Sequence, residues 1–146
     1  MQRRYLFMLV VTVILTACST NQNMKPGVTD GELSPCPKSP NCVSSLSEDT
    51  SRYVEPLLYT ATLEEAREKL ISVIHSLKRT EIVTAEMNYI HATFTSALFG
   101  FVDDVEFSFD DQRKVIDVRS ASRTGYSDLG VNRKRVEEIH KRFVNP

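Results

Sequence analysis

Apolar and polar residues alternate along three consecutive segments in the second half of the chain, residues 89–98, 104–109 and 115–122. Alternation with a period of two places all apolar side chains on one face of a β-strand. The pattern therefore predicts three strands of a sheet that is covered by apolar packing on one side only. The apolar positions are Ile90, Ala92 and Phe94, then Val105, Phe107 and Phe109, and finally Ile116 and Val118.

Two other segments have the period of an amphipathic helix. Thr62 and Glu65 form the sequence pattern of a capping box, which predicts that a helix begins there. Strand character is also present in residues 52–59, where Pro56 suits an edge strand, and in residues 80–85. The apolar helical positions are Leu63, Ala66, Leu70, Ile74 and Leu77 in the first helix and Val136, Ile139 and Phe143 in the last.

The order of these elements is strand, helix, four strands, helix. Four consecutive strands with short connections predict an antiparallel meander, whose apolar face the two helices can cover. We therefore predict an α+β fold, a two-layer sandwich in which an antiparallel sheet of about five strands carries two helices on one face. We interpret the other face of the sheet as a solvated surface or, alternatively, as a surface for a protein partner. Its polar side chains are His91, Thr93, Thr95, Glu106, Asp117 and Arg119.

The N-terminal residues have the pattern of a signal peptide. Arg3 and Arg4 precede an apolar run of 13 residues, 5–17, which is shorter than the roughly 20 residues that span a bilayer as a helix. The run Leu15-Thr16-Ala17-Cys18 resembles the lipobox of bacterial lipoprotein precursors. The resemblance implies that the Cys18 thiol is alkylated with diacylglycerol, that cleavage before Cys18 frees its amine, and that a fatty acid such as palmitate acylates this amine. An ordinary secretory signal is the alternative.

The residue after Cys18 indicates which membrane would hold the lipid anchor. Ser19 occupies the position where an aspartate would resemble the inner-membrane retention signal of enteric bacteria. We therefore expect a lipid-anchored protein of the cell envelope, at the periplasmic face of the outer membrane. The membrane is then a partner through the anchor.

Composition divides the chain into three parts. We predict a lipoprotein signal peptide in residues 1–17, a flexible tether in 18–34 and a single α+β domain in 35–146. The tether is rich in Ser, Thr, Asn and Gly and has no apolar period, so it cannot offset its ordering entropy. Removal of residues 1–17, which contain Arg3 and Arg4, changes the formal net charge from −1 to −3. This mildly acidic balance argues against a nucleic-acid partner.

Two cysteines remain besides Cys18. Cys36 and Cys42 enclose a short loop stiffened by prolines, and a disulfide is the default expectation in an oxidising compartment. A redox-active pair and a metal site are the alternatives, but the spacing is not that of thioredoxin-like enzymes. His75, His91 and His140 are scattered without ligand spacing, so we expect no metal.

Three stretches of the chain resemble the bacterial and plastid family known as domain of unknown function 1499. The resemblance implies a shared fold and a shared but unassigned function over residues 33–143. It brings no catalytic residue and no cofactor. The stretches are Cys36-Pro37-Lys38-Ser39-Pro40-Asn41-Cys42-Val43-Ser44-Ser45, then Phe101-Val102-Asp103-Asp104-Val105-Glu106-Phe107, then residues 119–135, which begin Arg119-Ser120-Ala121-Ser122-Arg123-Thr124-Gly125.

Polar residues concentrate around the glycine-bearing connection between the last strand and the last helix. Arginines, hydroxyl groups and free helix N–H groups could together hold a carboxylate or a phosphate. The alternative is a structural cluster, in which Asp128 caps the helix and Arg123 pairs with Asp103 or Asp104. Asp103 and Asp104 are neighbours in a strand and point to opposite faces, so we expect an internal ion pair with an arginine and no acid–base dyad. The candidate residues are Asp103, Asp104, Arg119, Ser120, Ser122, Arg123, Asp128 and Asn132.

The sequence contains no assembled set of acid, base and nucleophile. We therefore interpret the chain as a tethered, non-catalytic envelope domain that binds a ligand or a partner, either a small anionic molecule or an envelope protein. A small envelope enzyme that acts on an anionic substrate is the competing interpretation.

Overall fold

The computed structural model describes residues 25–145. The predicted signal peptide, the lipidation site Cys18 and the predicted tether up to residue 24 lie outside these residues. No helix within residues 25–145 is long and apolar enough to cross a membrane.

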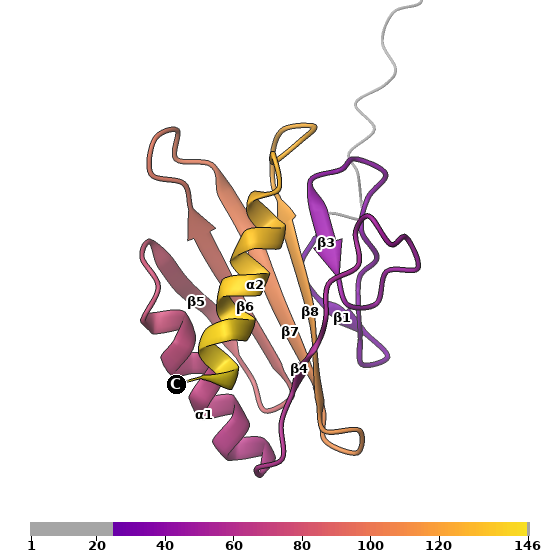
Figure 1. Ribbon diagram of the computed structural model, residues 1–146, viewed down its shortest axis with the longest axis vertical. Helices are drawn as coiled ribbons and strands as arrows, with labels where there is room; N and C mark the ends of the chain where they lie inside the picture. The colour runs from indigo at the N-terminus through magenta and orange to yellow at the C-terminus, as the bar shows by residue number, and fades with distance from the viewer. Residues whose placement is uncertain (1–24, 146) are drawn as a thin grey trace, which may run out of the picture.

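A six-stranded antiparallel sheet forms the centre of the domain, and both helices lie on one of its faces (Figure 1). The strand order is β3-β8-β7-β6-β5, and β4 pairs with β8 beyond the end of β3. This arrangement confirms the predicted α+β sandwich and its meander. The strands are β3 (Cys42–Ser44), β4 (Leu57–Leu58), β5 (Thr80–Ala85), β6 (Tyr89–Thr95), β7 (Val102–Asp110) and β8 (Val115–Ser122), and the helices are α1 (Leu63–His75) and α2 (Val131–Val144).

At the edge of the sheet, one predicted strand is shorter than expected and one strand was not predicted. The segment 52–59 contains only the two residues of β4, which follow Pro56 directly. Proline has no N–H to donate to a ladder, so strand pairing begins after it. The strand β3 was not predicted, because its three residues are all buried and show no alternation.

The two helices begin in different ways. At α1 the Thr62 hydroxyl accepts from the Glu65 N–H at 3.2 Å, and the Glu65 carboxylate accepts from the Thr62 N–H at 2.9 Å. This confirms the predicted capping box. At α2 the residue before the helix is Gly130, whose φ of +78° favours glycine. Asp128 supplies the side-chain cap there and accepts from the Asn132 N–H at 2.7 Å.

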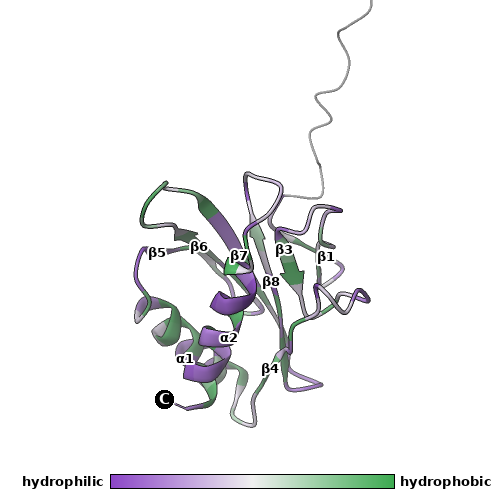
Figure 2. Ribbon diagram, turned by 45° about the horizontal axis from the view of Figure 1, so that its top comes forward, coloured by the Kyte–Doolittle hydropathy of each residue, from purple (hydrophilic) through white to green (hydrophobic). Residues whose placement is uncertain are grey.

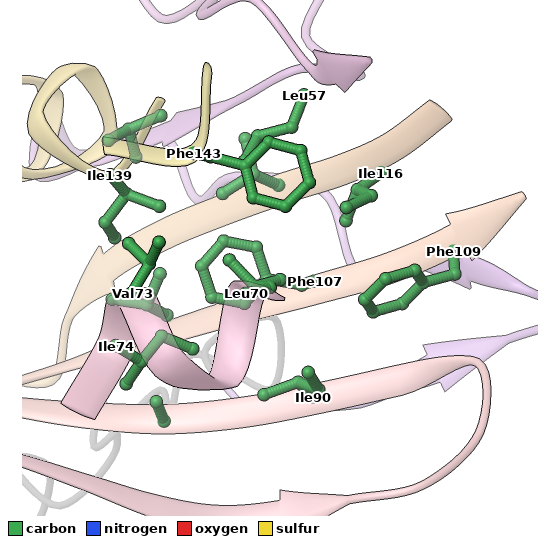
Figure 3. Packing of buried hydrophobic residues seen from close by; sticks show 14 of the residues in the cluster. Leu57, Leu70, Val73, Ile74, Ile90, Phe107, Phe109, Ile116, Ile139 and Phe143 are labelled. Carbon is green, nitrogen blue, oxygen red and sulfur yellow. The ribbon is translucent and has the colours of Figure 1, made fainter. Parts of the chain in front are cut away.

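The apolar core lies between the helices and the sheet. Figure 3 shows side chains of both helices meeting those of the central strands. Leu70, Ile74, Phe107 and Ile139 have no exposed surface. Burial of each such side chain stabilises the fold by about 1.5–3 kcal/mol, which holds the helices on this face.

The opposite face of the sheet is buried as well, which corrects the prediction of a solvated face. His91, Asp117, Glu106 and Arg119 are 0–8% exposed, whereas Thr95, near the end of β6, is exposed. The strands β1 (Val28–Thr29) and β2 (Glu32–Leu33) form a small hairpin that covers this face. Backbone groups of Gly27 and Gly31 bind Glu106 and Ser108, and Asp104 binds His91, so a polar strand face does not require solvent.

This hairpin also corrects the predicted extent of the tether. The Gly27 N–H donates to Glu106 at 2.6 Å, and the Ser108 hydroxyl donates to the Gly31 carbonyl at 2.8 Å. Leu33 is buried. Residues 25–34 therefore belong to the folded domain, because the sheet offers them hydrogen-bond partners that composition alone does not reveal.

Candidate functional site

The sheet divides the predicted polar cluster into two groups. Asp103, Ser120 and Ser122 lie on the helix side, where they meet α2. Asp104, Arg119 and Arg123 lie on the side of the N-terminal hairpin. The division follows from the strand period of two, because neighbouring residues point to opposite faces. The eight candidate residues therefore do not form one site.

Asn132 is the centre of the helix-side group and is completely buried. Its amide nitrogen donates to the Asn41 carbonyl and to the Ser122 hydroxyl, both at 3.0 Å. Its amide oxygen accepts from the Ser120 hydroxyl at 2.6 Å and from Arg135 at 2.7 Å. These four bonds use both amide protons and both lone pairs of the oxygen. Asn132 thus joins the start of α2 to β8 and to the cysteine loop and has no capacity left for a ligand.

The helix-side aspartate forms the expected internal ion pair. Arg135 donates to Asp103 at 2.6 Å, and both side chains are largely buried, 12% and 7% exposed. The guanidinium also lies over the Phe94 ring, 4.9 Å from its centroid. Arg135 lies three positions after Asn132, a spacing that places both residues on one side of a helix.

The hairpin side contains a second, denser network around Glu106. Arg119 donates to Glu106 at 2.6 Å, and neither side chain has any exposed surface. The Tyr89 hydroxyl donates to the other carboxylate oxygen at 2.8 Å, beside the Gly27 N–H. Burial and the nearby Glu106 carboxylate raise the pKa of Tyr89. This phenol therefore stays protonated and keeps its bond to Glu106.

Asp104 receives two partners on the same face. Arg123 donates to both carboxylate oxygens, at 2.9 and 2.8 Å, and His91 Nε2 lies 2.7 Å from one of them. Burial alone would raise the pKa of Asp104, but the hydrogen bonds from His91 and Arg123 outweigh it and lower the pKa to about 2. An ionised carboxylate only accepts, so His91 Nε2 carries the shared proton. The predicted pairing of Arg123 with an aspartate is confirmed.

Asp128 does not join Arg123 and Asp104. Its carboxylate binds the N–H groups of Gly130 and Asn132 at the start of α2, as the structural interpretation expected. The cysteine loop is closed by the predicted disulfide between Cys36 and Cys42. Within residues 25–145, no group of three His, Cys, Asp or Glu side chains is placed to hold a metal ion.

A groove lies elsewhere, between α2 and the segment 53–55. Its volume is about 430 Å³. Val54 and Val136, which are 4% and 2% exposed, form its apolar floor. Arg133 holds the two walls together by donating to the carbonyls of Tyr53 and Ser51, both at 2.8 Å. The remaining lining residues are Tyr53, Glu55, Glu137, His140 and Lys141.

The rim of this groove contains polar groups without internal partners. Within the described chain, the side chains of Glu137, His140 and Lys141 form no hydrogen bond and no ion pair. Such groups around an apolar floor are typical of a ligand site. The signal in the sequence is the spacing of Arg133, Glu137, His140 and Lys141, which puts them on one side of a helix. Sequence reasoning missed the site because it does not show which segment packs beside that side.

Comparisons with known proteins agree with the resemblance noted from the sequence. A comparison with curated proteins gives no match to this chain. A family model described as "Protein of unknown function (DUF1499)" matches residues 32–143, from β2 to the last turn of α2. The match covers well over half of the sequence and the whole helix-covered sheet. The chain therefore belongs to the DUF1499 family.

Proposed function

We propose that this protein is a lipid-anchored protein of the cell envelope whose domain binds a ligand in the groove beside α2. The ligand would combine an apolar body with an acidic group, and binding would involve no catalysis. The observation that carries the proposal is the groove itself: an apolar floor bounded by polar side chains that lack internal partners.

The contrast with the two internal networks supports this choice of site. Asn132 and Asp104 are occupied by neighbouring side chains and backbone groups. The side chains of His140 and Lys141 at the groove form no hydrogen bond and no ion pair within the described chain. An acidic ligand group could bind these side chains without breaking any hydrogen bond of the fold. Val54 and Val136 would contact the apolar part.

The lipid anchor is supported by the N-terminal sequence and by the disulfide. The run Leu15-Thr16-Ala17-Cys18 stands at the end of an apolar segment too short to span a bilayer. The disulfide between Cys36 and Cys42 is consistent with an oxidising compartment such as the periplasm. Two or three acyl chains on Cys18 would hold the protein on the membrane durably, whereas one chain binds only marginally.

Metabolic labelling with palmitate tests the anchor. We expect label in the wild-type protein and in Ser19→Ala, and none in Cys18→Ala, because acylation requires the Cys18 thiol and amine. Label that persists in Cys18→Ala, or its absence from the wild type, would overturn the anchor. Fractionation of Ser19→Asp tests the location, since we expect this variant to move from the outer to the inner membrane.

Binding in the groove is tested with anilinonaphthalene sulfonate, a probe that has an apolar body and an anionic group. We expect its addition to shift NMR resonances of residues 53–55 and 136–141. The double variant His140→Ala, Lys141→Ala should weaken binding about fivefold, since an exposed charge pair contributes up to about 1 kcal/mol. Lys134→Ala, an exposed position of α2 outside the groove, is the matched control. Shifts confined to other surfaces would refute the site.

A further inference from the structure

Five large apolar side chains are exposed on two neighbouring loops at one end of the sheet. One loop joins β6 to β7 and the other joins β8 to α2, and both lie at the top of Figure 1. In Figure 2 the tip between β6 and β7 is strongly hydrophobic. We call this surface the apolar end. It consists of Leu98 (81% exposed), Phe99 (72%), Phe101 (55%), Tyr126 (78%) and Leu129 (88%).

The fold holds the first loop away from the core. Ser96 closes it through two bonds to Phe101, one from the Phe101 N–H to the Ser96 hydroxyl at 2.9 Å and one from the Ser96 N–H to the Phe101 carbonyl at 2.8 Å. Gly100 turns the chain with a φ of +65°, a conformation that favours glycine. The Phe99 and Phe101 rings pack on each other, 5.7 Å between centroids. The aromatic tip is therefore a formed protrusion.

The second loop is fixed beside the first. The Arg123 N–H donates to the Val102 carbonyl at 3.1 Å, which joins the end of β8 to the start of β7. Asn41 of the cysteine loop donates to the Gly125 carbonyl at 2.6 Å. Single exposed apolar residues are common on soluble domains, but a group of this size on adjacent loops marks an interaction surface.

The N-terminal segment leads to the same end of the molecule. Gly27 binds Glu106, and Gly31 binds Ser108, so the segment runs along β7 in the direction from Val102 to Asp110. Gly27 therefore lies nearer than Gly31 to the Val102 end of β7, where the apolar end lies. Lys25 is seven positions after Cys18, a stretch of chain that can span at most about 25 Å. Lipid on Cys18 would thus keep Lys25 within about that distance of the bilayer.

The charges around the apolar end favour contact with a phospholipid membrane. Arg79 donates to the Thr95 carbonyl at the base of the β6–β7 loop, and Lys78 precedes it. Arg123, with a side chain 49% exposed, lies at the start of the second loop, where it also forms the ion pair with Asp104. The acidic Asp128 in that loop is occupied by the N–H groups of α2. Cations around an apolar tip complement the anionic headgroups of phospholipids.

We propose that the apolar end is a membrane-contact surface that inserts into the headgroup region of the bilayer carrying the anchor. Phe99, Phe101 and Tyr126 suit this position, because aromatic rings are enriched at membrane interfaces. The proposal rests on the proposed lipid anchor for its membrane. Contact at two points would fix the orientation of the domain and leave the groove beside α2 accessible from the periplasm.

Tryptophan fluorescence tests this contact directly, because the chain contains no tryptophan. We compare Phe99→Trp with Met87→Trp, an exposed apolar position between β5 and β6 at the other end of the sheet. The lipidated proteins are reconstituted in vesicles of phosphatidylethanolamine and phosphatidylglycerol. We expect the emission of Trp at position 99 to shift to shorter wavelength and to be quenched by doxyl-labelled lipid, while emission from position 87 does not change. Equal emission from the two positions would overturn the proposal.

A second experiment tests the membrane contact of the apolar end in the absence of the lipid anchor. Mature protein bearing Cys18→Ser, which lacks the acylation site, is added to the same vesicles. We expect measurable partitioning that falls roughly tenfold for each of Leu98→Ser and Phe99→Ser and falls further at high salt. Partitioning insensitive to both substitutions would overturn the contact even if palmitate labels Cys18. Absence of palmitate label with intact partitioning would overturn the anchor and support the contact.

Discussion

Phe107 and Glu106 are neighbours in β7, and neither has exposed surface, yet they lie in different environments. Phe107 packs among apolar side chains beneath the two helices. Glu106 binds a guanidinium, a phenol and a backbone N–H beneath a hairpin of two short strands. A thin cover can bury a charged face because paired side chains and a backbone N–H replace water at both carboxylate oxygens of Glu106. The difference shows that burial on this sheet is obtained by apolar packing on one face and by hydrogen bonding on the other.

The largest expected effect belongs to the apolar face. Phe107→Ala should lower the free energy of unfolding by about 3–5 kcal/mol, because it removes a buried ring and leaves a cavity beneath the helices. Urea denaturation of the purified protein measures the loss. Leu58→Ala, a 66% exposed position of β4, is the control and should change the stability by less than about 1 kcal/mol. A similar loss in both variants would contradict the assignment of the core.

On the hairpin face, Glu106→Gln should destabilise the protein by about 3 kcal/mol, because it leaves the buried charge of Arg119 without its counterion. The double variant Glu106→Gln, Arg119→Met should recover most of this loss, since it removes both charges. Urea denaturation of the single and double variants measures the coupling between the two residues. Equal instability of the two would show that the network contributes through packing and not through charge.

The contacts of Asp104 with His91 and Arg123 make the stability contribution of the hairpin face depend on pH. The contribution of apolar packing does not depend on pH. The pKa of Asp104 is lowered from 3.8 to about 2 in the folded protein. The unfolded chain therefore binds the proton more tightly, and the stabilisation, about 2 kcal/mol, is present above pH 4 and is lost as the pH falls through 2. Unfolding measured between pH 5 and 2 should show a steeper loss for the wild type than for Asp104→Asn. Parallel curves would contradict this contribution.

The smallest expected loss of stability concerns the β1–β2 hairpin, which covers the polar face of the sheet. Ser108→Ala removes the hydroxyl that donates to the Gly31 carbonyl and should cost about 1 kcal/mol. Hydrogen exchange should then increase in residues 27–33 and remain unchanged in α1, on the other face of the sheet. Faster exchange throughout the domain would show that the hairpin and the core unfold as one unit.

Local patterns identified much of the fold from the sequence. The alternation in residues 89–122 predicted the central strands, and Thr62 with Glu65 predicted the start of α1. The strand period also predicted that Asp103 and Asp104 point to opposite faces and that the aspartate on the covered side pairs with an arginine. These features depend on residues a few positions apart, whose geometry is set by the helix or strand that contains them.

Part of the candidate site was predicted, but not its arrangement. Asn132, Ser120 and Ser122 were correctly singled out as polar residues of one region, and they do bind one another. Their partner Asn41 is 91 positions away along the chain from Asn132, so no local pattern could show that they use up each other's hydrogen bonds. The groove beside α2 was missed for the same reason, since its second wall comes from residues 53–55.

By itself the sequence determined the two helices and the four strands of the meander, the family resemblance and the lipobox pattern at Cys18, because these depend on residue type and short spacing. Only the tertiary structure decided what covers each face of the sheet. Strand periodicity shows that His91, Glu106 and Arg119 share a face, but it does not show whether water or another segment lies against that face. The hairpin of residues 28–33 covers it because its backbone groups meet Glu106 and Ser108, two contacts that exist only after the chain has folded.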